Sequence, residues 1–187
     1  LNRLFTTMAS FTNTLSEASS DARPEVDPEL NIKTFYLGCL AQGSYMISHK
    51  GSAFIIDPRR DVDMYLEEIS SLGLRLKGVL ETHVHADFVS GHKELSSRMG
   101  VPIFIGAGAG VKCGHYPVDD GEVLVLSEDY AFLALSTPGH TLGCTTWVLV
   151  DRAHNNRPMM AFTGDTLFVG SVGRPDLLGS VGKSKED

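Results

Sequence analysis

The chain reads Glu81-Thr82-His83-Val84-His85-Ala86-Asp87-Phe88 near its midpoint. An apolar segment, Gly78–Leu80, leads directly into this stretch and predicts a buried strand over Gly78–Thr82. His83 and His85 are two residues apart, so on an extended backbone both imidazoles point to the same face. Two converging imidazoles are a natural chelate for a first-row transition metal. The stretch therefore predicts a metal site at the end of a strand.

Two later turns present further metal-binding groups in the same manner. In Ser136-Thr137-Pro138-Gly139-His140-Thr141, the Pro-Gly pair predicts a sharp turn that presents His140 after an apolar strand. In Phe162-Thr163-Gly164-Asp165-Thr166-Leu167, the bend falls at Gly164 and the presented group is Asp165. Each unit consists of a strand, a glycine and a ligand. Three such units in one chain predict that their ligands meet in one site.

The remaining pattern is that of short strands interspersed with two helices. Apolar residues recur at helical spacing over 62–72, with Asp61 as the expected N-cap and Gly73 as the end. A second helix is predicted from Phe88 to Met99, ending at Gly100. Further strands are predicted at Thr34–Leu37, Tyr45–Ser48, Ala53–Ile56, Pro102–Ile105, Val123–Leu126, Phe132–Ser136, Thr145–Val150 and Met159–Thr163.

The composition is that of one globular domain. The chain has 187 residues, of which 42% are hydrophobic and 21% charged, and no apolar run approaches the roughly 18–20 residues of a membrane span. Sixteen basic against 23 acidic residues give a net charge of −7, which argues against nucleic acid or an anionic membrane as a partner. Cys39, Cys113 and Cys144 are odd in number and far apart, which favours a reducing compartment over secretion.

Residues 1–30 differ from the rest of the chain. They are rich in Ser and Thr and lack core-forming residues, so we expect a disordered leader. Arg3 is the only base before Arg23, which leaves a mitochondrial transit peptide as a weaker alternative. The chain is therefore expected to be mitochondrial or cytoplasmic, with one domain over residues 31–187.

The order of these motifs resembles that of the metallo-β-lactamase superfamily, which runs H-x-H-x-D-H, then G-H, then G-D. Residues 32–180 follow this order and spacing. The resemblance implies an α/β fold, the αββα sandwich, in which two mixed sheets lie face to face with helices outside and the metal at the strand ends. Two segments resemble the persulfide dioxygenase branch in particular, including its members fused to rhodanese domains: His-Val-His-Ala-Asp-Phe-Val-Ser-Gly-His over 83–92 and Val-Gly-Arg-Pro-Asp-Leu over 172–177.

The resemblance implies a mononuclear Fe(II) held by His83, His140 and Asp165. Two histidines and one carboxylate on one face are the ligand set of non-haem iron oxygenases. His85 is then a catalytic group beside the metal and not a ligand. Asp87 is expected to orient a ligand or a bound water, as outer carboxylates do.

Three further residues are assigned supporting roles. Arg174 and Asp176 resemble a pair that braces the site in the family, and Arg174 could also attract the carboxylates of a glutathione-like substrate. Asp57 ends a predicted strand, where it either hydrogen-bonds the metal loop or simply forms an Asp-Pro turn.

The chain departs from the family pattern at two points. Phe88 stands where hydrolytic members have a histidine for a second metal, and a phenyl ring cannot bind a metal. The sequence stops at Asp187, before the position of a further metal-site histidine in the family. We therefore expect the sandwich to be incomplete at its C-terminus, either because the chain is a fragment or because another element completes it.

The resemblance implies an iron-dependent persulfide dioxygenase that oxidises glutathione persulfide, or a similar small persulfide, with O₂ to sulfite in sulfide metabolism. One alternative is a zinc-dependent thioester hydrolase of the glyoxalase II type, in which zinc activates a water. Another is a truncated product without catalysis. The implied partners are the small-molecule persulfide or glutathione conjugate and O₂, a second copy in a homodimer, and a rhodanese domain or protein outside this chain.

Overall fold

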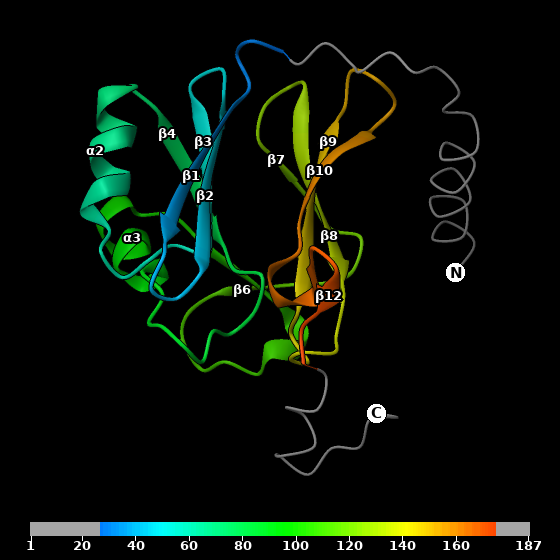
Figure 1. Ribbon diagram of the computed structural model, residues 1–187. Helices are drawn as coiled ribbons and strands as arrows, with labels where there is room; N and C mark the ends of the chain where they lie inside the picture. Colours follow the sequence, from blue (N-terminus) through cyan, green and yellow to red (C-terminus); the bar gives the residue numbers. More distant parts are fainter. Residues whose placement is uncertain (1–26, 175–187) are drawn as a thin grey trace.

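The computed structural model describes residues 27–174 of the protein. In this part of the chain, two β-sheets lie face to face (Figure 1). The first sheet contains β1 (Asn31–Leu37), β2 (Gln42–His49), β3 (Ser52–Ile56), β4 (Arg75–Leu80), β5 (Ile103–Gly106) and β6 (Tyr116–Val118). The second sheet has the order β10 (Arg157–Phe162), β9 (Thr145–Asp151), β8 (Tyr130–Ser136), β7 (Val123–Val125). A short hairpin, β11 (Leu167–Phe168) and β12 (Ser171–Val172), follows the second sheet.

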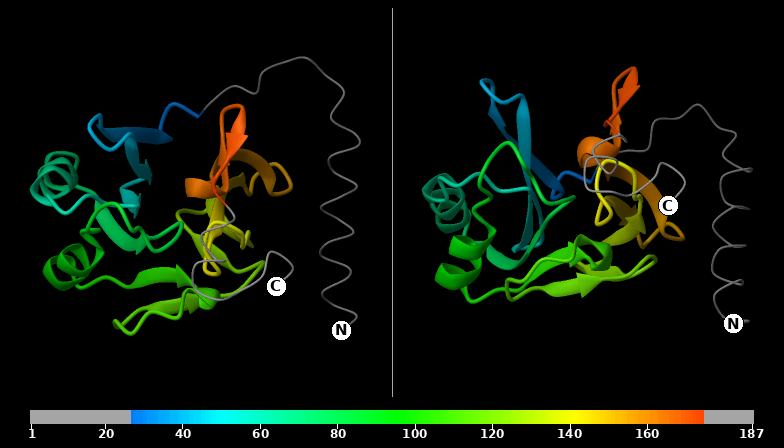
Figure 2. Two further views of the ribbon diagram at one scale, coloured as in Figure 1. Left: turned by 60° about the horizontal axis from the view of Figure 1, so that its bottom comes forward. Right: turned by 90° about the horizontal axis from the view of Figure 1, so that it is seen from below.

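Two helices, α2 (Asp63–Ser71) and α3 (His92–Met99), cover the outer face of the first sheet (Figures 1 and 2). α2 connects β3 to the parallel strand β4, and α3 connects β4 to the parallel strand β5. The strands β1 to β3 pair antiparallel, so the first sheet is mixed as expected. This arrangement confirms the α/β sandwich. Within residues 27–174, no α-helix covers the outer face of the second sheet.

Alternating side chains of the first sheet build two hydrophobic layers, because successive residues of a strand point to opposite faces. Ile56 packs between the two sheets with Phe132 and Trp147, whereas its neighbour Ile55 packs beneath the helices with Tyr65. Trp147 is fully buried, and its indole Nε1 donates a hydrogen bond of 3.1 Å to the backbone oxygen of Glu81. The core thereby ties the second sheet to the loop that follows β4.

The second helix begins later than its sequence predicts. It starts at His92, and residues 88–91 belong to the loop that precedes it. Ser90 Oγ donates a 2.5 Å hydrogen bond to the buried carboxylate of Glu81, which holds this segment outside the helix. A Cβ atom on Gly91 would overlap the backbone oxygen of Arg59, so only glycine fits at this position.

Smaller differences arise at the ends of other elements. The N-cap of α2 is Val62, not Asp61, and no side chain caps it. The edge strand β6, which contains Pro117, was not predicted because a three-residue strand has little pattern of its own. A short 3₁₀ turn, η1 (Ala107–Ala109), follows β5.

Several expectations lie outside the described residues. The predicted leader falls almost entirely on residues 1–26, and Asp176 lies in the segment 175–187. The boundary between leader and domain therefore remains a prediction. Among the helices of residues 27–174, none is long and apolar enough to cross a membrane.

Candidate metal centre

Loops from both sheets bring two histidines and one aspartate together. His83 follows β4 of the first sheet, His140 follows β8 of the second, and Asp165 lies in the 3₁₀ turn η2 (Gly164–Thr166) after β10. One ligand atom from each lies within 4.8 Å of the others. His140 Nε2 is 3.4 Å from Asp165 Oδ2, and the rings of His83 and His140 are 5.2 Å apart and nearly perpendicular. The three residues implied as metal ligands thus form one compact group.

Gly164 is required for this convergence. Its φ of +50° is a left-handed conformation that favours glycine. A Cβ atom there would also overlap the side chain of Thr82, directly before His83. The glycine before Asp165 therefore lets the two loops touch, which places the carboxylate beside the first histidine.

His83 is held by a chain of hydrogen bonds that ends at Asp57. The Asp57 carboxylate accepts from the backbone N–H of Thr82 and from its hydroxyl, both at 2.7 Å. The same hydroxyl lies 3.0 Å from His83 Nδ1. Because Thr82 gives its proton to Asp57, it accepts from Nδ1–H and leaves the lone pair of Nε2 free. Metal-binding histidines are commonly fixed in this way. Of the two alternatives for Asp57, the structure shows the one in which its carboxylate accepts hydrogen bonds from the loop that carries His83.

The protonation state of His83 also suits metal binding. Burial disfavours its charged form and lowers its pKa, and the neighbouring charge of His85 acts in the same direction. A neutral imidazole keeps the lone pair that a metal needs. His140 has a buried Nδ1 without a hydrogen-bond partner among the described residues, and its other nitrogen faces Asp165.

His85 belongs to a second buried group, with Asp57 and Glu81. Its ring lies 4.1 Å from that of His83, but its Nε2 is 3.1 Å from Asp57 Oδ1 and 3.4 Å from Glu81 Oε2. Burial opposes its positive charge, but the two carboxylates outweigh burial and raise the pKa of His85 to about 10. The two rings lie close together, but the two histidines belong to different groups.

Glu81 is a buried carboxylate beside the candidate site that no sequence motif singled out. Its carboxylate is buried and faces three side chains: His85, His92 Nδ1 at 3.1 Å, and Ser90. Burial alone would raise its pKa, but these partners prevail and lower it. The spacing of Glu81 and His85 was visible in the sequence, whereas the approach of His92 depends on where α3 begins.

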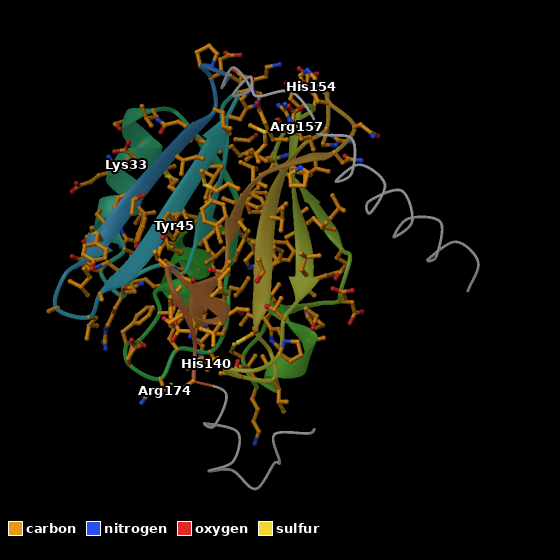
Figure 3. The ribbon with its side chains drawn as sticks, turned by 45° about the vertical axis from the view of Figure 1, so that its right-hand side comes forward. Lys33, Tyr45, His140, His154, Arg157 and Arg174 are labelled. Atoms are coloured by element: carbon orange, nitrogen blue, oxygen red, sulfur yellow. The ribbon has the colours of Figure 1, made fainter. Side chains whose placement is uncertain are left out.

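The remaining predicted residues are placed less centrally. The ring of Phe88 packs against His85 with centroids 4.3 Å apart. Asp87 is exposed and has no hydrogen bond or ion pair with another described residue. Arg174 is exposed and lies at the same end of the molecule as His140 (Figure 3). The structure therefore does not bring Asp87 into the ligand group, and Asp176 lies outside the described residues.

A further cluster of Asp27, Glu29 and His49 has a different character. His49 Nδ1 lies 2.8 Å from Ser127 Oγ, and its Nε2 lies 3.0 Å from Asp27 Oδ2. Both ring nitrogens are therefore already engaged. This cluster ties the segment before β1 to the loop before β8, and it leaves His83, His140 and Asp165 as the candidate metal centre.

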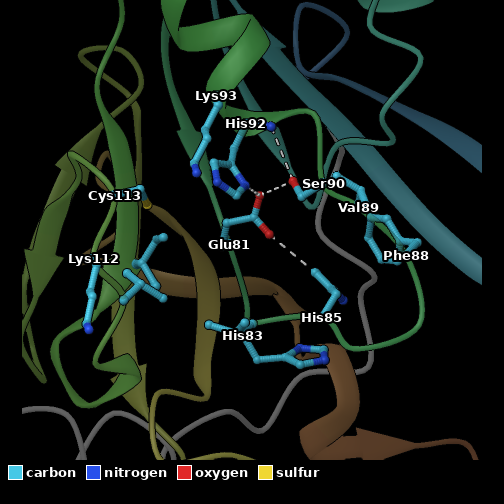
Figure 4. Close-up of a pocket in the computed structure, with 13 residues that line it drawn as sticks. Glu81, His83, His85, Phe88, Val89, Ser90, His92, Lys93, Lys112 and Cys113 are labelled. Atoms are coloured by element: carbon cyan, nitrogen blue, oxygen red, sulfur yellow. Dashed lines mark hydrogen bonds and ion pairs between the residues drawn. The ribbon is translucent and has the colours of Figure 1, made fainter.

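A cavity of about 580 Å³ adjoins this centre (Figure 4). Its lining includes His83 of the centre and the neighbouring His85. It lies between the loop after β4 and the segment after β5. Its position allows a molecule in the cavity to reach the metal-binding group.

Comparison with known proteins agrees with the motifs and the fold. The model of the metallo-beta-lactamase superfamily matches residues 37–186. Human mitochondrial persulfide dioxygenase ETHE1 is 34% identical over 141 residues, 71% of this chain and 51% of that protein. The cytoplasmic hydroxyacylglutathione hydrolase of Arabidopsis thaliana is 32% identical over 147 residues, 76% of this chain and 56% of that protein.

A solved structure gives the same result. A metallo-beta-lactamase from Staphylococcus aureus superposes with a TM-score of 0.74 at 35% identity, covering 81% of this chain and 47% of that one. The chain spans about half the length of the curated relatives it matches. The match of the family model over most of the chain, together with the shared sandwich, shows that this protein belongs to the metallo-β-lactamase superfamily.

Proposed function

We propose that this protein is an iron-dependent persulfide dioxygenase that oxidises glutathione persulfide or a similar small persulfide. The observation that carries the proposal is the separation of the two histidines of the H-x-H motif. His83 joins His140 and Asp165, whereas His85 is paired with Asp57 and Glu81. The metal-binding group then has two histidines and one carboxylate, the set that suits mononuclear iron oxygenases.

The residues fit such a metal. The free Nε2 of His83 follows from the hydrogen bond at its Nδ1, and Asp165 supplies an anionic oxygen within reach of His140. When bound, iron(II) supplies open coordination positions and the redox chemistry that O₂ requires. Zinc would accept the same donors, so the ligand set alone does not choose between the two metals.

The surrounding residues have defined tasks in this proposal. Thr82 and Asp57 fix the orientation of the His83 ring. The positive charge on His85 offsets part of the negative charge of Asp57 and Glu81 beside the site, and Phe88 covers the His85 ring. The overall reaction is RSSH + O₂ + H₂O giving RSH + SO₃²⁻ + 2 H⁺, so the terminal sulfur is oxidised and O₂ is reduced.

The alternative function is that of a zinc-dependent thioester hydrolase. The Arabidopsis hydroxyacylglutathione hydrolase supports it, because it matches a larger share of this chain than the human persulfide dioxygenase does, 76% against 71%. Hydrolysis by this route relies on two metals that clamp one hydroxide. Phe88 offers no ligand for a second metal and Asp87 is exposed, so the local arrangement favours the dioxygenase.

We also infer a reducing compartment, mitochondrial or cytoplasmic. Cys39, Cys113 and Cys144 are all free thiols. The two relatives named above carry the words mitochondrial and cytoplasmic in their names. Small thiols and persulfides persist where thiols are kept reduced, which agrees with the proposed substrate.

Oxygen consumption separates the two functions. Iron-loaded protein is given glutathione persulfide in a sealed oxygen-electrode cell, and sulfite is measured at the end. A dioxygenase consumes one O₂ for each sulfite formed. A hydrolase needs no O₂ and cleaves S-lactoylglutathione equally well under nitrogen. Thioester cleavage under nitrogen without persulfide-dependent O₂ uptake overturns the proposal, and the absence of both activities supports a non-catalytic product.

A further inference from the structure

The cavity beside the metal-binding group has the size of a small-molecule site. Its volume of about 580 Å³ lies within the range of roughly 300–1,000 Å³ found for such sites. Because His83 of the candidate centre lines the cavity, a molecule bound there would have one end beside a metal ligand. The rest of that molecule would contact residues outside the centre.

Part of the cavity wall is apolar. Phe88 and Val89 line one side, and Ile105 and Val111 contribute from β5 and the segment after it. Val89 is 62% exposed, a large fraction for an apolar side chain. A bound molecule would cover this surface and gain hydrophobic contact.

Two lysines give the cavity an uncompensated positive charge. Lys93, in the first turn of α3, and Lys112, after η1, both line it and are both exposed (Figure 4). Neither forms an ion pair with a described residue, whereas Lys33 and Lys50 are paired with carboxylates. This is notable in a chain of net charge −7.

The acidic group of the lining does not neutralise these lysines. Glu81 is the carboxylate among the described lining residues, and it already faces His85, His92 and Ser90. Figure 4 shows Lys93 and Lys112 across Glu81 from Phe88. The lysines are therefore available to an anion that enters the cavity.

We propose that this cavity holds the organic part of the substrate, that Lys93 and Lys112 contact its carboxylates, and that Phe88 and Val89 pack against its apolar atoms. The substrate is then a carboxylate-bearing small persulfide of about the size of a tripeptide, with its sulfur end toward His83. This assignment rests on the proposed function. It adds a substrate-binding site to the metal-binding group.

Binding of S-methylglutathione to the metal-free protein tests the site without catalysis. The methyl group blocks the sulfur, so calorimetry reports only the contacts of the organic part. Lys93→Gln and Lys112→Gln should each raise Kd about two- to fivefold, because exposed lysine–carboxylate pairs are individually weak. The double variant should raise Kd about tenfold, and added salt should weaken binding to the wild type.

Lys77→Gln is the matched control. Lys77 is outside the cavity lining, and its Nζ donates to the backbone oxygen of Val125. This variant should bind S-methylglutathione as the wild type does. A double variant that binds as tightly as the wild type, or a wild type that does not bind at millimolar concentrations, overturns the assignment.

Kinetics with two persulfides separates this assignment from the proposed function. With glutathione persulfide, the double variant should show a KM about tenfold higher and an unchanged kcat. With the uncharged 2-hydroxyethyl persulfide, its KM should be unchanged. Equal effects on both persulfides contradict the carboxylate site. If the wild type oxidises neither persulfide but the lysines still govern S-methylglutathione binding, the proposed function fails and the binding site stands.

Discussion

Nε2 of His85 lies 3.1 Å from Oδ1 of Asp57, so the second histidine of the H-x-H motif is paired with a buried carboxylate. Asp57 also fixes His83 through the Thr82 hydroxyl. One carboxylate thus positions both histidines but gives them different roles. His83 is left with a free nitrogen for a metal, and His85 is held as a charged neighbour.

We expect His85→Gln to retain metal and lose activity. The variant removes the positive charge beside the site but no member of the group formed by His83, His140 and Asp165. Metal content should stay within about twofold of the wild type while kcat for persulfide falls about 10- to 1,000-fold, the range of a lost electrostatic contact in a transition state. Plasma mass spectrometry and oxygen uptake on the same sample give both values. Parallel loss of metal and activity would instead identify His85 as a ligand.

Gly164→Ala should lower metal affinity. The loss should exceed the effect of placing alanine at a positive φ, because the added methyl group also meets a neighbouring loop. The added methyl group meets the Thr82 side chain and pushes the Asp165 loop away from His83. Gly170→Ala is the matched control, because Gly170 also has a positive φ, +80°, with no atom within 4 Å of the added Cβ. Competition with a chromogenic chelator should show at least about a tenfold loss for the first variant. Equal metal affinity of the two variants contradicts the role assigned to the close approach.

Thr82→Val should weaken metal binding and destabilise the fold. The variant keeps the shape of the side chain but removes the hydroxyl between Asp57 and His83. Loss of such an outer contact typically costs about 10- to 100-fold in metal affinity, and the lost hydrogen bond to the buried carboxylate costs about 1–3 kcal/mol of unfolding free energy.

Thr82→Ser is the control for this change, since it restores the hydroxyl. Chelator competition and urea unfolding should place it near the wild type. If Thr82→Ser behaves like Thr82→Val, then the methyl group and not the hydroxyl supports His83.

Phe88→His should not create a second stable metal site in the 187-residue chain. The new imidazole would stand next to His85, which Asp57 and Glu81 already hold, and next to the exposed Asp87. Zinc titration of the wild type and the variant should give about one equivalent in each. A second tightly bound zinc in the variant would show that the loop can be turned into a binuclear site by one substitution.

The sequence predicted those features that local pattern specifies. A strand end located His83, and a strand end with a glycine turn located His140 and Asp165, because both features are visible in a few consecutive residues. The structure brings these three residues together. The alternation of apolar residues likewise located most strands of both sheets.

The network around Glu81 could not be predicted, because it depends on contacts across the fold. Glu81 reaches His92 and Ser90 only when α3 begins at His92, and the helical pattern had suggested a start at Phe88. The tie from Trp147 to the Glu81 backbone joins residues 66 positions apart in the chain. Such pairings follow from tertiary packing and leave no local signal.

The metal content of Asp165→Ala, measured beside the wild type, tests the central claim most directly. Both proteins are purified without chelators and analysed by plasma mass spectrometry. The wild type should carry about one iron per chain. Asp165→Ala should carry almost none, because it loses one of three ligands and the anionic oxygen that reaches His140. An Asp165→Ala variant that keeps its iron would contradict the assignment of His83, His140 and Asp165 as the metal-binding group.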